Sequence, residues 1–437
     1  MVKLKGTAGN DVLGGLASDD RIAGLAGNDT LIGAGGFDTL DYSASPAAVT
    51  VNFLTGKALD GYGNVDTISG FEEVNGSRYA DVIVLGNGIF ESAFGHAGSD
   101  KLYGNAGEDW LRPGSGYDYV DGGSGNDTVS YFAYAGVPDL PQSRGIAVNL
   151  ELGTAIDAWG NADQLMSIEN VESSILDDRI VGSSASNQFI MRGGSNYVDG
   201  GGGVDEIVYR KVSNPVVVNL NNGIALTGGG ERDTLGDIEN VRGSSYNDTI
   251  IGNRYNNRID GGLGNDSIYG EDGKNVLIGG EGNDRIFSGA NADYIDGGPG
   301  TDTVYYIRAL HGIAANLTLH QAKSGLDSDS LFNIENVFGS NYKDVLTGDA
   351  RNNMIWAAKG DDFINGGGGN DYIDGGPGID TVFYAGSRSD YVVSRAGADV
   401  VVRDGVSSNG DYGVDTLHDV EQVLIGGQIY GVSDLIF

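Results

Sequence analysis

The chain contains no cysteine, few histidines, few basic residues and no long apolar segment. Its 437 residues include 0 Cys and 4 His, and 26 basic side chains stand against 61 acidic ones, which gives a formal charge of −35 at pH 7. Without cysteine, neither disulfides nor thiolate metal sites hold the fold together. The acidic excess disfavours nucleic-acid binding, which needs cationic side chains. No segment has the length of a membrane span, and no apolar segment near Met1 has the form of a secretory signal.

Motifs for catalysis are also scarce. The four histidines, His96, His311, His320 and His418, form no His-Glu-x-x-His pair. The sequence holds no Gly-x-Ser-x-Gly turn, no phosphate-binding loop and no cysteine nucleophile. Carboxylates are abundant, but a carboxylate that holds a metal ion cannot also act as the acid or base of a glycosidase. We therefore expect no catalytic residues and no enzymatic activity.

The dominant feature of the sequence is a nine-residue repeat. Twenty-five units share Asp or Asn at the sixth position and an aliphatic or aromatic residue at the eighth. Two of the clearest copies are Gly122–Val129 (Gly-Gly-Ser-Gly-Asn-Asp-Thr-Val) and Gly375–Val382 (Gly-Gly-Pro-Gly-Ile-Asp-Thr-Val). The sixth residue is Asp in twenty units and Asn in five, at Asn187, Asn196, Asn257, Asn275 and Asn353. Repetition at one fixed period predicts a single structural unit stacked many times.

Each half of the unit favours a different local structure. The three residues around the apolar eighth position form a short strand that points one side chain inward. The glycine-rich half favours a sharp turn, because glycine tolerates positive φ and close backbone approach. Two units then make one flattened coil, and coils stack about 4.8 Å apart. The predicted fold is all-β, a parallel β-roll or β-solenoid of nonapeptide repeats.

The aspartates of such a coil become neighbours along one edge. Turns on the same edge are two units apart, so aspartates eighteen residues apart in sequence lie side by side. Two stacked carboxylates repel each other unless a cation sits between them. Carboxylate and glycine carbonyl oxygens in a flexible loop suit calcium better than magnesium or a soft transition metal. We therefore expect several bound Ca²⁺ ions, and a chain that is largely disordered without them.

The repeat falls into five blocks, which are separated by connectors and followed by a tail. The expected blocks are residues 1–42, 76–131, 173–209, 243–306 and 339–384. The connectors are residues 43–75, 132–172, 210–242 and 307–338, which we expect to continue the solenoid as wider β coils. Residues 385–437 are expected to form a β-rich C-terminal cap, in which residues 391–395 and 399–403 look like paired strands.

Two further patterns mark the connectors. Each connector contains an apolar-Glu-(Glu/Asn)-Val signature, at Phe71–Val74, Ile168–Val171, Ile238–Val241 and Ile334–Val337. Its Glu and Asn have either a structural stacking role, which the recurrence favours, or form a glycan-binding surface. Each block closes on a tyrosine, which we expect to cover the end of the apolar ladder, at Tyr42, Tyr131, Tyr209, Tyr306 and Tyr384.

The run Gly-Gly-x-Gly-x-Asp-x-U-x, with U apolar, resembles the RTX (repeats-in-toxin, hemolysin-type) calcium-binding proteins. The resemblance implies a calcium-bound parallel β-roll, export by a type I secretion exporter, and folding outside the cell where calcium is met. The last residues, Asp434-Leu435-Ile436-Phe437, are similar to the acidic-plus-three-hydrophobic ending of type I secreted relatives. The alternative for this segment is a last strand that ends in apolar residues.

The candidate calcium ligands are carboxylates at position six and glycines of the strongest turns. They are Asp11, Asp20, Asp29, Asp38, Asp100, Asp109, Asp118, Asp127, Gly264, Asp266, Gly282, Asp284, Gly300, Asp302, Asp362, Asp371, Gly378 and Asp380. The first two blocks favour sites on both edges, and the fifth favours Asp362 with Asp380. If every same-edge pair of units held one ion, the blocks would hold at most about 14 ions.

Asparagine at position six predicts weaker sites, because it supplies no charge. In block 243–306 one edge carries Asp248, Asp266, Asp284 and Asp302, while the other carries Asn257, Asn275 and Asp293. Ions should therefore line mainly the first edge. Block 173–209 pairs Asp with Asn on both edges and should bind calcium most weakly.

These observations favour a secreted, non-catalytic calcium-binding repeat protein, located outside the cell or at its surface, with a structural or adhesive role. Two alternatives stay open. The chain is the repeat portion of a secreted polysaccharide-modifying enzyme, although the repeat begins by residue 6, or it is a module that binds an extracellular glycan. Outward positions vary too much for the regular threonine ladder that ice binding requires.

Overall fold

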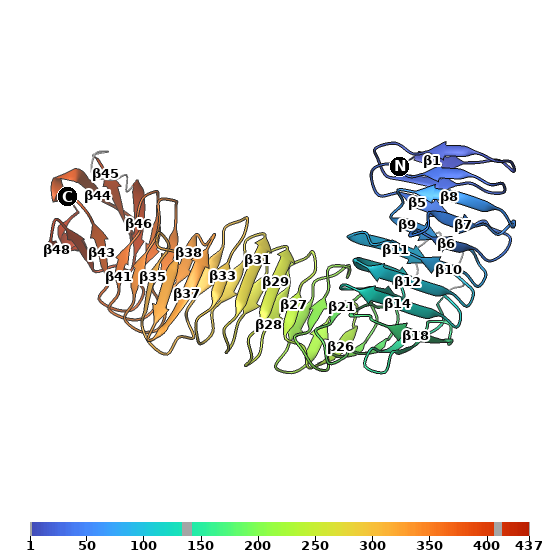
Figure 1. The fold of residues 1–437 in the computed structure, drawn as a ribbon. Coiled ribbons are helices and arrows are strands. Elements are labelled where there is room, and N and C mark those ends of the chain that lie inside the picture. The colour runs from blue at the N-terminus through green and yellow to red at the C-terminus, as the bar shows by residue number, and fades with distance from the viewer. Residues whose placement is uncertain (1, 133–141, 406–412, 437) are drawn as a thin grey trace. The chain divides into compact units, whose positions relative to one another are not determined.

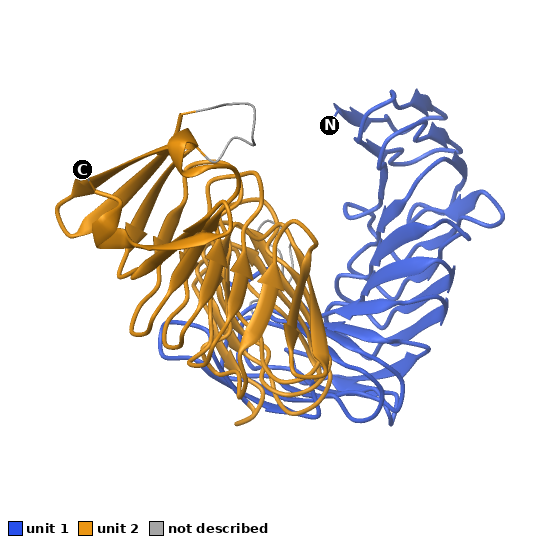
Figure 2. Ribbon diagram, turned by 90° about the vertical axis from the view of Figure 1, so that its left-hand side faces the viewer, with its two compact units in different colours: residues 1–212, 224–238 blue, residues 213–223, 239–437 orange. Residues whose placement is uncertain are grey.

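The computed structural model describes residues 2–132, 142–405 and 413–436, and almost all of its regular structure is β (Figure 1). The chain divides into two compact units (Figure 2). Unit 1 contains residues 1–212 and 224–238, and unit 2 contains residues 213–223 and 239–437. Within the described residues, no helix has both the length and the hydropathy of a membrane span.

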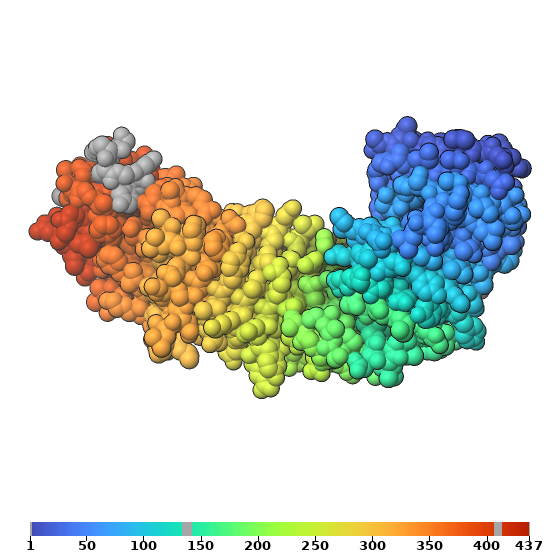
Figure 3. Space-filling model, viewed as in Figure 1, coloured from blue at the N-terminus to red at the C-terminus, as the bar shows by residue number. Residues whose placement is uncertain are grey.

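Each unit is a parallel β-solenoid with two sheets. In unit 1, β3 (Asp20–Ala23) pairs in parallel with β1 (Val2–Lys5) and β5 (Thr39–Asp41). Ile22 stands opposite Leu4 on one side and Leu40 on the other, so neighbouring strands are eighteen residues apart. Within each unit successive coils follow one another in chain order (Figure 3). The predicted coil of two nine-residue units is therefore the building block of the fold.

The strands of unit 1 form two sheets. One sheet continues from β1, β3 and β5 through β9 (Glu73–Asn75), β11 (Phe90–Phe94), β13 (Glu108–Arg112), β15 (Thr128–Ser130), β19 (Asn170–Glu172), β21 (Gln188–Ile190) and β23 (Glu206–Val208). The other contains, in spatial order, β2 (Val12–Gly14), β4 (Thr30–Ile32), β8 (Val65–Ser69), β7 (Lys57–Leu59), β6 (Thr50–Asn52), β10 (Val82–Val84), β12 (Lys101–Ala106), β14 (Tyr119–Ser124), β18 (Ala162–Met166), β17 (Thr154–Ile156), β16 (Ala147–Asn149), β20 (Arg179–Val181), β22 (Tyr197–Asp199), β26 (Arg232–Gly236) and β25 (Ile224–Leu226).

Unit 2 has the same organisation. One sheet contains β27 (Asn240–Arg242), β29 (Arg258–Leu263), β31 (Val276–Glu281), β33 (Tyr294–Asp296), β37 (Asp327–Phe332), β36 (Gln321–Ser324), β35 (Ile313–Asn316), β39 (Val345–Thr347), β41 (Phe363–Asn365), β43 (Thr381–Tyr384), β47 (Gln422–Ile425) and β48 (Gln428–Gly431). The other contains β24 (Val217–Asn219), β28 (Thr249–Ile251), β30 (Ser267–Tyr269), β32 (Arg285–Phe287), β34 (Thr303–Tyr305), β38 (Asn336–Phe338), β40 (Met354–Trp356), β42 (Tyr372–Asp374), β46 (Val414–His418), β45 (Asp399–Asp404) and β44 (Tyr391–Ala396).

The core is a pair of thin ladders made by the eighth residue of each nine-residue unit. Ile259, Leu277 and Ile295 form part of one ladder and are fully buried. Among the position-eight residues, Leu13 in the first coil is the one that keeps some exposure. Because burying such a side chain stabilises the fold by about 1.5–3 kcal/mol, each coil contributes little alone and depends on its neighbours.

The connectors continue the solenoid, but they do so asymmetrically. In the first connector β8 pairs in parallel with β4, β6 pairs in parallel with β10, and β7 lies antiparallel between β6 and β8. The opposite sheet runs directly from β5 to β9 to β11. The first, second and fourth connectors each add a three-stranded antiparallel meander to one sheet only. The expectation of wider coils did not include this inserted strand.

Block 76–131 contains one repeat unit, residues 86–94, that the sequence pattern did not reveal. Residues 86–94 place Ala93 in the buried ladder, and β11 pairs with β9 and β13 in the ordinary register. Position six is Glu91, whose carboxylate accepts the backbone amide of Gly88. The sequence pattern concealed this unit because neither Asp nor Asn occupies its sixth position.

The tail closes unit 2 with antiparallel pairs. Strands β44 and β45 pair across a turn at Gly397, whose φ is +70°, as the sequence predicted. A 3-10 turn, η1 (Arg388–Asp390), precedes them, and a second, η2 (Val432–Asp434), follows β48. Leu435 is 2% exposed. The alternative of a last strand at Asp434–Phe437 is wrong for Asp434, which lies in η2, and Phe437 lies outside the described residues.

Candidate metal centres

The position-six carboxylates form hydrogen-bonded rows along the edges of the solenoid. The backbone amides of Asp248, Asp266 and Asp284 each donate to Oδ1 of the aspartate eighteen residues later, at 2.7 Å in all three cases. The same link joins Asp100 to Asp118 and Asp109 to Asp127. The topology thus places the sequence-predicted carboxylates side by side in the pairs that the eighteen-residue spacing indicates.

The second oxygen of most of these carboxylates is buried without a hydrogen-bond donor. Within the described part of the chain, Oδ2 has no hydrogen-bond partner in Asp29, Asp38, Asp109, Asp118, Asp127, Asp266, Asp284, Asp302, Asp362, Asp371 and Asp380. All eleven are among the residues that the sequence predicted as ligands. A buried, unsatisfied carboxylate oxygen is costly unless a proton or a cation compensates its charge.

Burial also shifts the acidity of these groups. Desolvation raises the pKa of Asp266 to about 8 and that of Asp302 to about 7. Desolvation, with repulsion from Asp127, raises the pKa of Asp109 to about 7. The pKa of Asp380 also rises to about 7 through burial. In the absence of a cation these carboxylates therefore hold their protons far better than exposed aspartates do.

Glycine makes room for oxygen donors beside these carboxylates. A Cβ atom on Gly261 would collide both with Oδ2 of Asp266 and with the carbonyl oxygen of Gly279 in the next coil. A Cβ on Gly279 would likewise meet Oδ2 of Asp284 and the carbonyl oxygen of Gly297. The unsatisfied carboxylate oxygen and a backbone carbonyl oxygen therefore face the same small space. A hard cation with several oxygen ligands, such as calcium, fits this donor set.

The predicted glycine ligands have a packing role that is visible in the structure. Gly264 and Gly282 have φ of +114° and +141°, and a Cβ on Gly282 would clash with the carbonyl of Gly264. A Cβ on Gly300 would clash with the carbonyl of Gly282, and one on Gly378 with that of Gly360. Close stacking of the turns therefore requires glycine at these positions, whether or not their carbonyls bind an ion.

The first coil of the chain differs from the sequence expectation. Oδ2 of Asp11 accepts the backbone amide of Thr7 at 2.6 Å, and Oδ2 of Asp20 accepts that of Leu16 at 2.6 Å. Asp29 and Asp38 in the next coil have no such donor in the part of the chain that the structure describes. The sequence treated all four aspartates as equal, whereas the structure separates Asp11 and Asp20 from the carboxylates that need a cation.

The later blocks open on aspartates that the protein satisfies by itself. The repeat unit that starts each of these blocks carries serine at position two, and its hydroxyl donates to the position-six carboxylate. The pairs are Ser77 with Asp81, Ser174 with Asp178, Ser244 with Asp248 and Ser340 with Asp344. The opening aspartate of every block therefore has local hydrogen-bond donors.

Sequence reasoning missed the acidic residues that end each row. Four connector aspartates and Asp415 of the tail join the rows through backbone links, and Oδ2 of each accepts a hydrogen bond from the hydroxyl of the tyrosine that closes the block. The pairs are Tyr42–Asp66, Tyr131–Asp163, Tyr209–Asp233, Tyr306–Asp329 and Tyr384–Asp415. The tyrosines therefore end the carboxylate rows and do more than cover the apolar ladder. The available signal was an Asp-x-aliphatic triplet whose aspartate stands eight residues before the valine of each apolar-Glu signature and before Val423 of the tail.

Three connector glutamates and Glu421 of the tail end rows on the other edge. Oε2 accepts the position-six amide of the preceding coil in the pairs Asp38–Glu72, Asp127–Glu169, Asp302–Glu335 and Asp380–Glu421. The connector asparagines also accept backbone amides, as Asn170 does from Gln188 and Asn336 from Met354. These bonds support the structural role that the sequence favoured over a glycan surface.

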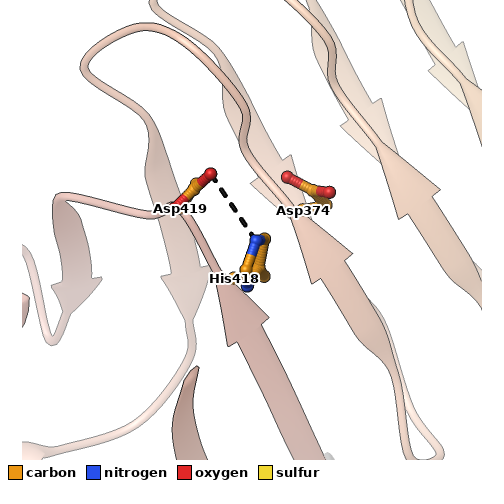
Figure 4. A group of neighbouring side chains, drawn as sticks. All are labelled: Asp374, His418 and Asp419. Atoms are coloured by element: carbon orange, nitrogen blue, oxygen red, sulfur yellow. Dashed lines mark ion pairs between the residues drawn. The ribbon is translucent and has the colours of Figure 1, made fainter. Parts of the chain in front are cut away.

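One group near the end of unit 2 combines histidine with aspartates. Asp374, His418 and Asp419 each direct one potential ligand atom into a common space (Figure 4). Nδ1 of His418 lies 2.7 Å from Oδ1 of Asp399, and its Nε2 lies 3.6 Å from Oδ2 of Asp419. The bond to Asp399 raises the pKa of His418, which favours the imidazolium ion. The group is a surface ion-pair cluster.

The fold and its edges define a class of protein, a parallel β-solenoid whose turns present oxygen-lined cation sites. A family model of the RTX calcium-binding nonapeptide repeat matches residues 5–40, 94–129, 174–207, 242–277, 269–304, 338–372 and 347–382. No curated protein matches the chain. The chain therefore belongs to the RTX calcium-binding nonapeptide-repeat proteins.

Proposed function

We propose that this calcium-binding repeat protein is secreted, folds when it meets calcium outside the cell, and acts there as a structural or adhesive element. The observation that carries the proposal is the set of buried aspartate oxygens that have no donor among the described residues. A charge of −35 opposes compaction until cations neutralise part of it. RTX repeat proteins are typically secreted, which supports the extracellular location.

Export by a type I exporter is the route that we propose. The support is the similarity of the C-terminal segment, Asp434 to Phe437, to the ending of type I secreted relatives. Secretion before folding also fits a chain whose packing depends on calcium, because the calcium-free chain stays unfolded until it reaches a calcium-rich environment. Appending a folded tag after Phe437 is expected to reduce export, and export that does not change would argue against this route.

We further propose that the protein has no catalytic activity. Its buried position-six carboxylates take part in the hydrogen-bonded rows, and His418 is paired with Asp399. Acidic groups that hold cations or backbone amides are poorly placed to transfer protons to a substrate. An assay on extracellular polysaccharides with calcium present, which detects products in proportion to protein, would contradict this part of the proposal.

The experiment that tests the central proposal is a calcium titration of the full chain followed by far-UV circular dichroism. We expect a cooperative gain of β signal between about 0.1 and 1 mM calcium, the range typical of extracellular modules, and no comparable gain with magnesium. A chain that shows the full β signal in chelator would contradict the proposal. Size-exclusion chromatography of the same samples separates folding from aggregation.

A groove in unit 1 favours glycan binding as a second candidate function. It has a volume of about 460 Å³ and lies over the outer face of the sheet that contains β9, β11 and β13. It is lined by Arg21, Phe37, Glu73, Asn75, Phe90, Ser92, Phe94, Trp110 and Arg112. Aromatic side chains beside a few polar groups suit a sugar ring, and the volume is that of a small-molecule site. The groove lies at the unit 86–94 that departs from the repeat.

The aromatic ladder of unit 2 is a poorer candidate for sugar binding. Tyr269, Phe287 and Tyr305 stack with ring centroids 4.2 and 4.5 Å apart, so their faces cover one another. A glycan array with calcium present, using the wild type, Trp110→Ala and the exposed control Tyr79→Ala, tests the groove. Binding that Trp110→Ala abolishes and Tyr79→Ala keeps is the expected result, and a blank array would contradict this candidate.

A further inference from the structure

Asparagine replaces aspartate at position six in five units, and two of these asparagines stand well inside their rows. The Oδ1 atom of Asn275 accepts the backbone amide of Asn257 at 2.9 Å, as an aspartate would. The Oδ1 atom of Asn196 accepts the backbone amide of Asp178 at 2.9 Å. Both side chains are 2–3% exposed. Their carboxamides therefore occupy the place of the aspartate carboxylates in neighbouring coils.

The Nδ2 atom of each carboxamide donates hydrogen bonds to backbone carbonyl oxygens of its own turn. Nδ2 of Asn275 lies 3.2 Å from the carbonyl oxygen of Gly270, 3.3 Å from that of Asp272 and 3.4 Å from that of Gly273. All three carbonyls belong to the turn that Asn275 closes. In the turns of Asp266, Asp284 and Asp302 the equivalent atom is Oδ2, which has no hydrogen-bond donor among the described residues. The amide hydrogens thus supply the positive partner that the carbonyl oxygens of an aspartate turn would take from a cation.

Asn196 shows the same arrangement in unit 1. Its Nδ2 lies 3.1 Å from the carbonyl oxygen of Gly193 and 2.8 Å from Oδ1 of Asp233. It also lies 3.3 Å from the carbonyl oxygen of Gly194. The orientation of each amide group is determined by its surroundings, because backbone donors face Oδ1 and acceptors face Nδ2. A neutral group therefore satisfies both the row and the turn.

The asparagines in the second unit of a block close their turns in a related way. Nδ2 of Asn187, Asn257 and Asn353 donates to the backbone carbonyl of the connector residues Glu169, Glu239 and Glu335, at 2.7–2.8 Å. The Oδ1 atoms accept the amide of position two in their own units. Together with the serine-bonded opening aspartates, they complete the first coil of blocks 173–209, 243–306 and 339–384 with protein hydrogen bonds.

We propose that Asn196 and Asn275 are internal replacements for calcium, which interrupt the ion rows and leave their own turns free of metal. The proposal rests on the proposed binding of calcium by the aspartate turns and assigns which turns take part. In block 243–306 calcium ions line the edge that carries Asp266, Asp284 and Asp302. On the other edge the turn of Asn275 is closed by hydrogen bonds and holds no ion. In block 173–209 the turn of Asn196 closes without an ion.

Calcium stoichiometry of the full chain tests the proposal directly. Asn275→Asp turns a donor into a second carboxylate oxygen that faces the carbonyls of Gly270, Asp272 and Gly273, so we expect this variant to bind one calcium ion more than the wild type. Equilibrium dialysis at saturating calcium, with metal counted by mass spectrometry, gives the ratio. The control Asn256→Asp adds the same charge at an exposed position on the same edge and is expected to leave the ratio unchanged.

Two further variants keep the test decisive if Asn275→Asp does not fold. Asn196→Asp is expected to add one ion in block 173–209. The reciprocal change Asp284→Asn is expected to remove one ion while the β signal at saturating calcium is retained. Folded Asn275→Asp or Asn196→Asp with the wild-type ratio would overturn the proposal, as would Asp284→Asn that keeps every ion. A wild type that binds no calcium would instead contradict the proposed function.

Discussion

The two edges of block 243–306 share one backbone fold but differ in how they neutralise their turns. On one edge Asp266, Asp284 and Asp302 keep a buried oxygen without a donor among the described residues. On the other, the carboxamides of Asn257 and Asn275 donate to carbonyl oxygens. The position-eight residues of both edges are equally buried. Packing of the apolar ladders is therefore common to both edges, and the difference between them is electrostatic.

This comparison shows how a repeat protein can vary its dependence on a metal without changing its fold. An aspartate turn is costly until a cation arrives, because buried carboxylate charge is poorly solvated. An asparagine turn is neutral and complete, but it gains nothing from calcium. Because aspartate turns and asparagine turns occur on different edges, only some edges of the solenoid depend on the metal.

Removal of calcium should produce the largest difference between regions with aspartate turns and regions with asparagine turns. With excess chelator we expect amides in residues 261–305 to exchange rapidly with solvent, because repulsion within the aspartate rows is no longer offset. Amides in residues 182–208, where Asn187 and Asn196 close their turns, should lose protection at a lower free calcium concentration. Hydrogen exchange read by mass spectrometry along a calcium series measures this order. Simultaneous loss in both regions would show that the turns do not differ in their need for calcium.

In the calcium-free chain, a change of pH should alter the stability of the aspartate edge more than that of the asparagine edge. The pKa of Asp266 is raised to about 8 and that of Asp302 to about 7 by burial, against about 3.9 in an unfolded chain. A raised folded-state pKa stabilises the fold below the unfolded pKa, and this contribution is lost as pH rises through about 7–8. On the other edge Asn257 and Asn275 do not titrate, and Asp293, whose pKa burial raises to about 7, is the position-six group that does.

The chelated chain should therefore gain β signal as pH falls from 8 towards 5, and circular dichroism measures the change. Calcium affinity should fall over the same range, since protons compete for the carboxylates. The variant Asp266→Asn should show a smaller acid-induced gain. A chelated chain that loses β signal on acidification would contradict the assigned direction of the pKa shifts.

Backbone conformation at position four offers a smaller test of the comparison. Gly282, on the aspartate edge, has φ of +141°, and Asn291, on the other edge, has φ of +74°. Gly282→Ala adds a Cβ that clashes with the carbonyl of Gly264 and should destabilise the calcium-bound fold by at least about 1–3 kcal/mol. Asn291→Gly should be tolerated, because glycine adopts positive φ without strain. Urea unfolding at saturating calcium measures both, and equal midpoints would contradict the prediction.

The smallest expected effect lies in the surface cluster of His418. Its pKa is raised by the hydrogen bond with Asp399, so its contribution is complete below pH 6.5 and is lost as pH rises through the folded-state pKa. His418→Gln should lower the melting temperature slightly at pH 6 and have no effect at pH 9. Thermal unfolding at both pH values with calcium present measures it. An equal loss at pH 9 would indicate a packing role for the ring.

The amino-acid sequence by itself determined the architecture of the coil. A period of nine, an apolar eighth residue such as Leu277 and glycines such as Gly282 are enough to predict a parallel solenoid, because strand alternation and positive φ are local properties. The sequence also indicated which carboxylates, for example Asp266 and Asp284, come to lie side by side. Eighteen residues is a spacing that the coil length sets directly.

Tertiary structure alone decided which of these carboxylates need a cation. Asp20 and Asp38 both occupy position six, but the amide of Leu16 satisfies Oδ2 of Asp20, while Oδ2 of Asp38 has no donor among the residues described. Likewise, only the folded chain brings the hydroxyl of Tyr306 to Asp329, and the carboxamide of Asn275 to its own turn carbonyls. Hydrogen-bond satisfaction depends on the partners that stacking brings within about 3 Å, and a repeat pattern does not record them.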